Sequence, residues 1–388
     1  MNILVVCSTA EEWNTSSMLC MELICKGFLE LGHKVALVTP QADENSRYFN
    51  KNHSFEHENL IHLRFGTCIK KSDIAVQPKK TAVSSVKNAV LNVYRAFDLF
   101  GRSIQTLKYT DEIKSKIKES GFIPDVIFSA SDPKVSHILA GKLLDIFPQK
   151  PYFLQYWGDP LTLDIARKTL TPKFVRKAIE NSILKKADKV VYVSHLTLDE
   201  QKEFFPKLAY KMAYQPTPCE AHIYNQLDEK YIGYFGSYNS SVRNIKPLYE
   251  AVNKNKNFKL IIIGDSDVKL EPTEYVEIID RIPAEELEKY YDTCGIIANL
   301  TNDFGSQIPA KIFRDAGTNK EVLLLFNEKN GNSVKDYFSK YERYTLCPNS
   351  VDSISEALEE YDKNGIPKRA PLKAFDYVTV AEAVLEKI

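Results

Sequence analysis

The chain has 388 residues, of which 44% are hydrophobic and 11% aromatic, and its formal net charge at pH 7 is zero. This composition is typical of a globular protein long enough for two domains, and it excludes a disordered chain. No segment approaches the roughly 18 apolar residues of a membrane span, and the first residues, MNILVVCSTAEEWN, lack the basic region of a signal peptide. We therefore expect a cytoplasmic protein that is at most peripheral on the inner face of the membrane.

Charge is unevenly distributed along the chain. Residues 1–220 carry 30 Lys and Arg against 24 Asp and Glu, a net charge of +6. Residues 221–388 carry 21 against 27, a net charge of −6. A basic first half favours an anionic partner. Because no nucleic-acid-binding motif accompanies it, the sequence predicts an anionic membrane surface or an anionic acceptor and no nucleic acid.

The seven cysteines form no CxxC pair and have no histidine at the spacing of a metal site. An odd number of cysteines, several of them in apolar segments, is typical of reduced thiols in the core of a cytosolic protein. We predict neither a metal site nor a cofactor.

Strand-like and helix-like segments alternate along the first half. The strands are expected at 2–7, 35–39, 61–65, 125–129, 152–156 and 189–193, and the helices at 16–31, 84–107, 133–147, 173–186 and 194–205. This order predicts a parallel sheet with helical crossovers. The helix at 84–107 carries Lys87, Arg95 and Arg102, with Lys108 just beyond, and is the segment expected to face an anionic membrane.

The same pattern restarts after PTPC (216–219), a plausible linker because of its prolines. The strands are expected at 231–235, 258–263, 275–278, 295–299 and 321–326, and the helices at 245–253, 284–291, 308–317 and 350–362. The sequence thus predicts an α/β protein with two doubly wound domains, 1–215 and 222–370. Residues 371–388 would form a C-terminal helix that packs back toward the first domain. Ligands of such folds bind at the carboxyl ends of the strands, so we expect the site in the cleft between the domains.

One strand-to-helix turn suggests a phosphate site. In YFGSYNSSVRNIKPLYEAV (234–252) a strand-like run ends at Gly236, and Arg243 and Lys246 open the next helix. Glycine lets backbone amides approach a ligand closely, and a helix N-terminus favours phosphate. Arginine can hold phosphate oxygens in a planar fork, and lysine adds a point charge. A plain turn with two solvated cations explains the same pattern, and the motif alone leaves both interpretations open.

The second half resembles the donor domain of GT-B glycosyltransferases, most closely the family-4 type. The resemblance rests on four stretches in order: YFGSYNSSVRNIKPLYEA (234–251), LIIIGDSD (260–267), RIPAEELEKYYDTCGIIANL (281–300) and GSQIPAKIFRDAGTNKEVLLLF (305–326). The first half matches only in layout. The resemblance implies two Rossmann-like domains facing across a cleft and transfer of a sugar from a nucleotide-sugar donor, with retention of anomeric configuration. The lack of a G-x-G-x-x-G fingerprint already argues against a dehydrogenase.

The resemblance also assigns residues to the donor. Gly236 and Gly264 would let the loops approach the diphosphate. Arg243, Lys246 and Lys311 would bind it, and the first and last of these cations would neutralise the leaving nucleoside diphosphate, which is electrostatic catalysis. For Lys311 a solvated lysine at a helix end is the alternative.

The nucleotide base and the sugar have their own expected contacts. Arg281 and Ile282 match the segment whose backbone reads the base, and Gln307 would bond sugar hydroxyls. The sequence departs from the family where many members carry two glutamates eight positions apart, because Ser306 and Arg314 stand there. The sequence therefore offers no carboxylate at the position that would bind the ribose, and Arg314 is expected to bind phosphate instead.

Acceptor contacts are expected from the first domain. Glu11, Trp13 and Asn14 follow its first strand, and an aromatic ring beside polar side chains suits a sugar. Asp159, in QYWGDPLTLD (155–164), could position or deprotonate an acceptor hydroxyl as a catalytic residue. His137 would lie in the same region. Each has a structural alternative: Trp13 packed on its own domain, Asp159 as a helix N-cap before a proline, and His137 as a core histidine.

The leading functional prediction is a hexosyltransferase-like enzyme that uses a nucleotide sugar. Its acceptor would be a glycan or a lipid-linked glycan in the biosynthesis of a surface polysaccharide such as capsule or O-antigen. Two alternatives remain open: a nucleotide-sugar epimerase with a GT-B-like fold, and a non-catalytic nucleotide-sugar-binding pseudo-transferase.

Overall fold

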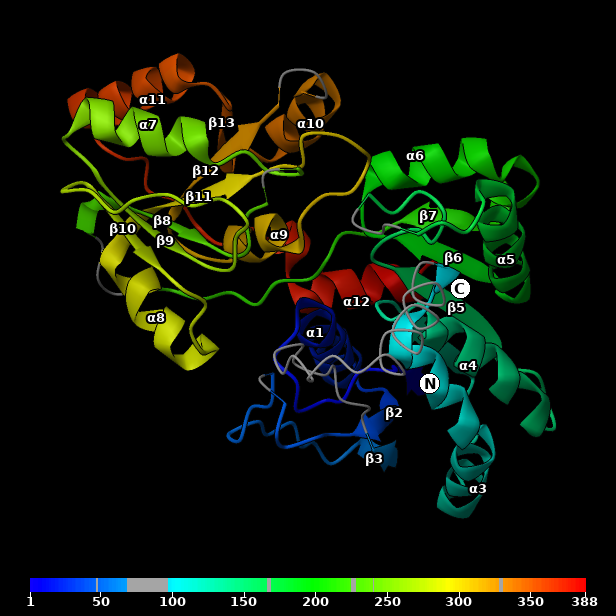
Figure 1. The fold of residues 1–388 in the computed structure, drawn as a ribbon. Helices are drawn as coiled ribbons and strands as arrows, with labels where there is room; N and C mark the ends of the chain where they lie inside the picture. The colour runs from blue at the N-terminus through cyan, green and yellow to red at the C-terminus, as the bar shows by residue number, and fades with distance from the viewer. Residues whose placement is uncertain (47, 68–96, 166–168, 225–227, 240, 328–330) are drawn as a thin grey trace, which may run out of the picture. The chain divides into compact units, whose positions relative to one another are not determined.

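The structure is a computed structural model, and it describes residues 1–46, 48–67, 97–165, 169–224, 228–239, 241–327 and 331–388. The chain divides into two compact units (Figure 1). Unit 1 comprises Met1–Pro216 and Val380–Ile388, and unit 2 comprises Thr217–Thr379. Within the described residues, no helix combines the length and the apolar character needed to cross a bilayer.

Unit 1 is built on a seven-stranded parallel sheet in the order β3-β2-β1-β4-β5-β6-β7. Its strands are β1 (Asn2–Val6), β2 (Lys34–Gln41), β3 (Leu60–Thr67), β4 (Val126–Ala130), β5 (Tyr152–Trp157), β6 (Lys189–Tyr192) and β7 (Met212–Tyr214). The α-helices are α1 (Ser16–Glu30), α3 (Thr110–Ser120), α4 (Val135–Leu143), α5 (Lys173–Lys186) and α6 (His195–Phe204). Among its described residues there are also the 3₁₀ helices η1 (Gly101–Tyr109), η2 (Leu144–Ile146) and η3 (Pro206–Lys211).

Both faces of this sheet are covered, which explains why its strands are almost continuously apolar. Side chains of α3, α4, α5 and α6 pack in one hydrophobic cluster. Those of α1 pack in the other, together with Val380, Ala381 and Val384 from α12 (Tyr377–Leu385). The C-terminal segment therefore supplies part of the core of unit 1.

Unit 2 contains a six-stranded parallel sheet in the order β10-β9-β8-β11-β12-β13. The strands are β8 (Asp228–Phe235), β9 (Lys259–Ile263), β10 (Val276–Ile279), β11 (Cys294–Leu300), β12 (Glu321–Phe326) and β13 (Tyr344–Pro348). The α-helices are α7 (Lys246–Asn255), α8 (Ala284–Thr293), α9 (Ala310–Ala316), α10 (Gly331–Phe338) and α11 (Val351–Asn364), and the 3₁₀ helices are η5 (Ser339–Tyr341) and η6 (Lys373–Phe375). Helices α7 and α11 lie side by side over one face, and α8 covers the other (Figure 1).

The predicted α/β class with two doubly wound domains is confirmed by these sheets. Several details differ from the prediction. Residues 84–96 of the long basic helix lie outside the described residues, and Gly101, with φ 61°, begins the separate 3₁₀ helix η1. Helices α3 and α10 and strands β7 and β13 were not predicted. The six cysteines that the structure describes are free thiols.

Candidate functional site

The most distinctive group of side chains in unit 2 lies at the carboxyl end of its sheet, around Gly236. This glycine follows β8 and adopts φ 140°, a conformation that side-chain-bearing residues rarely take. A Cβ atom added to it would lie 3.5 Å from the Nζ atom of Lys311. The Lys311 ammonium thus lies directly beside the turn that ends β8, although 75 positions separate the two residues in sequence.

Lys311 is held in an unusual environment. Its Nζ atom lies 3.5 Å from the centre of the Tyr234 ring, a cation–π contact. The atom is buried and has no hydrogen-bond partner among the described residues. Burial, and next the positive charge of Arg243, hold the pKa of Lys311 well below its ordinary value. A buried amine without a partner costs free energy, so this position is built for something other than stability.

Arg243 is fixed in place by two bonds from its guanidinium. Its Nε atom donates to Oδ1 of Asn302 at 2.8 Å, and one terminal nitrogen donates to the Ser237 carbonyl at 3.3 Å. The Asn302 amide in turn donates to the Gln307 carbonyl at 2.8 Å. Because Asn302 follows β11 and Arg243 follows β8, this chain of bonds spans the point where the strand order of the sheet reverses. In doubly wound sheets that point is where ligands bind.

The remaining predicted donor residues lie at the ends of neighbouring strands. Gly264 follows β9 with φ 152°, and a Cβ atom there would come within 2.4 Å of the Gly236 carbonyl oxygen, so the two glycine turns stack closely. Lys246 is the exposed first residue of α7. Arg281 follows β10, where its guanidinium lies 3.6 Å from the Asp265 carboxylate. Ile282 packs on the hydrophobic cluster beneath α8.

Arg314 turns towards its own domain. Its Nε atom donates to Asp315 at 3.0 Å, and another guanidinium nitrogen donates to the Tyr291 hydroxyl. The Asp315 carboxylate is buried and also accepts bonds from Tyr291 and from Asn299, both at 2.9 Å. These bonds to residues of unit 2 hold the buried carboxylate in place. Asp315 therefore does not replace the glutamate that the resemblance leads one to expect near Ser306 or Arg314.

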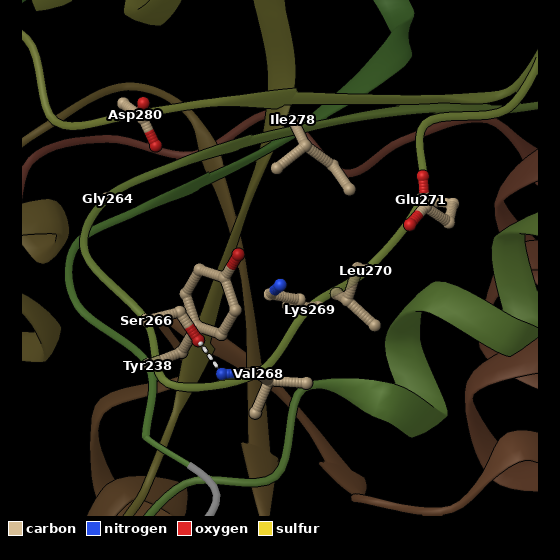
Figure 2. Close-up of a pocket in the computed structure, with 9 residues that line it drawn as sticks. All are labelled: Tyr238, Gly264, Ser266, Val268, Lys269, Leu270, Glu271, Ile278 and Asp280. Carbon is tan, nitrogen blue, oxygen red and sulfur yellow. Dashed lines mark hydrogen bonds between the residues drawn. The ribbon is translucent and has the colours of Figure 1, made fainter.

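A pocket of about 310 Å³ opens beside these turns (Figure 2). It lies between the loops after β8 and β9 and strand β10, and its lining includes the Tyr238 ring, Lys269, Ile278 and Asp280. It shares Gly264 with the donor candidates. Figure 2 shows the Tyr238 ring pointing into the pocket and Asp280 at its edge.

In unit 1 the loops after β4 and β5 bring together acidic side chains around one buried lysine. The Nζ atom of Lys134 donates to Asp132 at 2.8 Å and to Asp164 at 3.3 Å. Burial would lower the pKa of Lys134, but Asp132, Asp159 and Asp164 together hold it above its ordinary value. Asp159 is only half-buried. No helix begins at Pro160, since residues 160–165 are non-helical and α5 starts at Lys173, so the N-cap interpretation of Asp159 is wrong.

The other predicted acceptor residues are largely internal. His137 has 0% exposure, shares a hydrogen bond of 2.7 Å with Ser129 and stacks on Trp157 with ring centres 4.3 Å apart. Burial, and next the charge of Lys134, hold the pKa of His137 well below its ordinary value, so the ring is neutral. An acceptor cannot touch such a side chain in this structure, and the structural alternative describes it better.

Glu11 and its neighbours form a packed loop. The Glu11 carboxylate is buried and contacts His62 at 2.8 Å and also Arg64. Trp13 is buried as well and packs near Tyr48, as the structural alternative expected. Asn14 is half-buried, and its backbone amide donates to the Tyr48 carbonyl at 2.8 Å. Of the predicted acceptor residues, Asn14 and Asp159 are those with appreciable exposed surface.

Comparison with known proteins identifies the fold of the chain. No family model matches the sequence, and no curated protein matches it significantly. Solved structures match over the whole chain. The chain has the GT-B fold. Sucrose-phosphate synthase from Thermosynechococcus elongatus aligns with a TM-score of 0.61 at 12% identity, covering 100% of this chain and 98% of that one.

Two further glycosyltransferase-type structures show the same GT-B likeness. HepE from Anabaena, solved in complex with UDP and glucose, aligns with a TM-score of 0.60 at 12% identity, covering 100% of this chain and 98% of that one. The lipopolysaccharide outer core galactosyltransferase WaaB aligns with a TM-score of 0.54 at 11% identity, with both chains covered completely. At such identities the likeness concerns the GT-B fold and not the chemistry.

Sequence reasoning missed three residues, two beside the candidate donor residues of unit 2 and one among the carboxylates of unit 1. Tyr234 lies under the Lys311 ammonium, Asn302 orients Arg243, and Lys134 gathers the carboxylates of unit 1. Asn302 could have been found, because a polar residue two positions after a buried strand lies at the ligand-binding edge of a parallel sheet. Nothing in the sequence signals the partners of Tyr234 or Lys134.

Proposed function

We propose that this protein is a glycosyltransferase that takes its sugar from a nucleotide-sugar donor. The observation that carries the proposal is the buried Lys311 ammonium, which has no hydrogen-bond partner among the described residues and lies beside Gly236. A cation in such a place favours an anionic ligand, because the ligand would supply the missing bonds and charge.

The donor diphosphate fits this place in charge and in position. Gly236 and Gly264 let the backbone approach it, Arg243 offers guanidinium donors already held in position by Asn302, and Lys311 adds its ammonium. When the bond between the sugar and the diphosphate breaks, negative charge develops on the leaving phosphate oxygen. Preorganised cations at that oxygen stabilise the transition state more than the ground state, which accelerates the reaction. Lys246, Gln307 and Arg281 extend the donor site in this proposal, and the backbone at Ile282 reads the base.

Asp159 is the proposed acceptor residue. It is half-buried at the carboxyl end of β5, and it is not an N-cap. Its carboxylate would position the acceptor hydroxyl or accept its proton. We propose that the acceptor is a glycan or lipid-linked glycan of surface polysaccharide biosynthesis, and that transfer retains the anomeric configuration, which requires no dedicated nucleophile.

Binding tests the proposal first. A melting screen with UDP, GDP, dTDP and CMP and their sugar conjugates should identify a donor, because a ligand at 100 times its Kd stabilises the folded state by about 2.7 kcal/mol. The matching diphosphate should bind more tightly than the monophosphate. If no nucleoside diphosphate changes the melting temperature at millimolar concentration, the proposed donor site does not exist.

Product analysis then decides between transfer and the alternatives. A non-catalytic nucleotide-sugar-binding protein is the second candidate. In its favour, the position where the resemblance leads one to expect a glutamate is occupied by Arg314, which donates hydrogen bonds to Asp315 and Tyr291. Mass spectrometry with the identified donor separates the outcomes. A glycosylated acceptor or free sugar supports a transferase, an isomerised nucleotide sugar supports an epimerase, and an unchanged donor supports the non-catalytic candidate.

A further inference from the structure

Helix α5 presents a basic face with exposed apolar side chains at its ends. We define the α5 surface as the exposed residues of this helix together with Leu170 before it and Tyr210 beside it. The members from the helix are Lys173, Phe174, Lys177, Ala178, Ser182, Lys185 and Lys186. Phe174 is 74% exposed, Leu170 67% and Tyr210 80%, so three large apolar side chains of this surface face solvent.

The helical repeat produces this face. Ile183 and Leu184 point into the core of unit 1. Residues on the opposite side of the helix, which recur every three to four positions, therefore face outward. Glu180, the only acidic residue of α5, is buried and accepts bonds from the backbone amides of Leu161 at 3.0 Å and Thr162 at 2.9 Å. Because this carboxylate points inward, the four exposed lysines of α5 have no exposed acidic residue of the same helix among them.

Neighbouring segments extend the surface at both ends of the helix. At the beginning, the Thr171 hydroxyl donates to the Phe97 carbonyl at 2.7 Å, which brings the half-exposed Phe97 next to Leu170. At the other end, the Lys211 ammonium donates to the carbonyl oxygens of Lys185 and Ala187, which places Tyr210 beside the last turn of α5. Apolar side chains thus flank the lysines on both sides.

We propose that the α5 surface docks unit 1 onto an anionic lipid bilayer. The helix would lie parallel to the membrane plane, with Leu170 and Phe174 inserted among the lipid chains and Tyr210 at the headgroup level. The lysines would contact anionic headgroups, each contributing the attraction of one cation near a charged surface. The helix of 14 residues is about 21 Å long. Lys186 lies about 140° around the helix axis from Lys173, so the headgroup contacts are assigned to Lys173, Lys177 and Lys185.

Charge and chemistry favour lipid over other occupants. In a symmetric pair of chains, the same patch would face itself, and lysines would oppose lysines without an acidic partner in the α5 surface. The phosphates of a nucleic acid could contact the lysines, but a nucleic acid has no apolar phase in which Leu170 and Phe174 could be buried. A bilayer with anionic headgroups accommodates both features. This proposal is independent of the donor chemistry, so its failure would leave the proposed function unaffected.

Vesicle sedimentation tests the proposal with the full chain. Vesicles of phosphatidylcholine alone are compared with vesicles that also contain phosphatidylglycerol. The wild-type protein should sediment with the anionic vesicles at low salt and dissociate as the salt concentration rises. K173Q/K177Q should lower the partition coefficient about 30-fold, which corresponds to about 1 kcal/mol per cation. Phe174→Ser should lower it about tenfold, because an inserted aromatic ring is lost.

Matched controls on the same unit separate the surface from overall charge and apolarity. K114Q/K118Q removes two lysines from α3, and Ile123→Ser removes a side chain that is 62% exposed elsewhere. Both should retain wild-type partition, and melting temperatures should show that every variant is folded. The proposal is overturned if the wild type binds neither vesicle at low salt, or if the controls lose as much binding as the α5 variants. Sedimentation equilibrium adds a further outcome: a dimer dissolved by Phe174→Ser would assign the surface to a second copy of the chain and overturn the lipid proposal.

Discussion

Replacing Lys311 with methionine should stabilise the protein while it abolishes tight binding of the donor diphosphate. The Lys311 amine is buried without a hydrogen-bond partner among the described residues, and its Nζ atom lies 3.5 Å from the centre of the Tyr234 ring. Methionine fills much of the same space without a charge and makes favourable contacts with aromatic rings. The substitution therefore removes the desolvation cost and keeps the packing.

The expected magnitude follows from two opposing contributions. Leaving a buried donor unsatisfied costs about 1–3 kcal/mol, and the cation–π contact returns about 0.5–2 kcal/mol. The net gain for Lys311→Met is about 1 kcal/mol, which raises the melting temperature of a domain of this size by about 2–4 °C. The pKa of Lys311 is lowered in the folded state, so the unfolded chain binds the proton more readily. The gain is therefore largest at low and neutral pH and vanishes as the pH rises towards the ordinary pKa of lysine.

Affinity should change in the opposite direction. Loss of a charge-assisted bond to phosphate costs about 1.5–3 kcal/mol, or about 10- to 150-fold in Kd for the matching nucleoside diphosphate. Calorimetry measures this affinity, and thermal melting without ligand measures stability. Lys259→Met is the matched control, because Lys259 also lies over a tyrosine ring, Tyr231 at 5.7 Å, but is exposed at the amino end of the sheet. The reasoning is refuted if Lys311→Met melts at or below the wild-type temperature and binds the diphosphate within twofold of wild type.

Three further predictions concern other parts of the chain. Arg243→Ala should weaken binding of the same diphosphate by about 10- to 150-fold in calorimetry, and unchanged affinity would remove this residue from the donor site. Asp159→Asn should lower turnover by about 10²–10⁴-fold with little change in donor affinity; near-normal turnover would reject its role at the acceptor. In unit 1, the hydrogen bond to Glu11 raises the pKa of His62 in the folded protein. The pair therefore stabilises the fold fully below the ordinary pKa of histidine, and this contribution is lost as the pH rises through the raised pKa of His62. His62→Gln should flatten the dependence of melting temperature on pH between about 6 and 8, and an identical pH profile in both proteins would show that the pair contributes nothing.

The sequence alone was sufficient for the fold class. Buried parallel strands appear as apolar runs, and amphipathic helices between them show the helical repeat, so local patterns reveal the alternation of strands and helices. The glycine that ends β8 could also be predicted, because a strand-to-helix turn near a ligand often requires the backbone freedom that only glycine has. Strand β13 was not predicted, because Tyr344–Pro348 is short and only partly apolar.

Tertiary structure decided which distant residues meet. Lys311 reaches Gly236 because β8 and β11 are neighbours in the sheet, a pairing that no local pattern encodes. Burial is not encoded locally either: Glu11 occurs in a polar stretch and His137 in a predicted helix with no mark of which side faces inward, yet both side chains lie inside unit 1. Local sequence reports the periodicity of one segment, whereas burial and the charge around a side chain depend on elements far away in the chain. Donor residues could therefore be proposed from the sequence, but the buried state of Lys311 beside the Tyr234 ring and the charge of Arg243 is a result of tertiary packing.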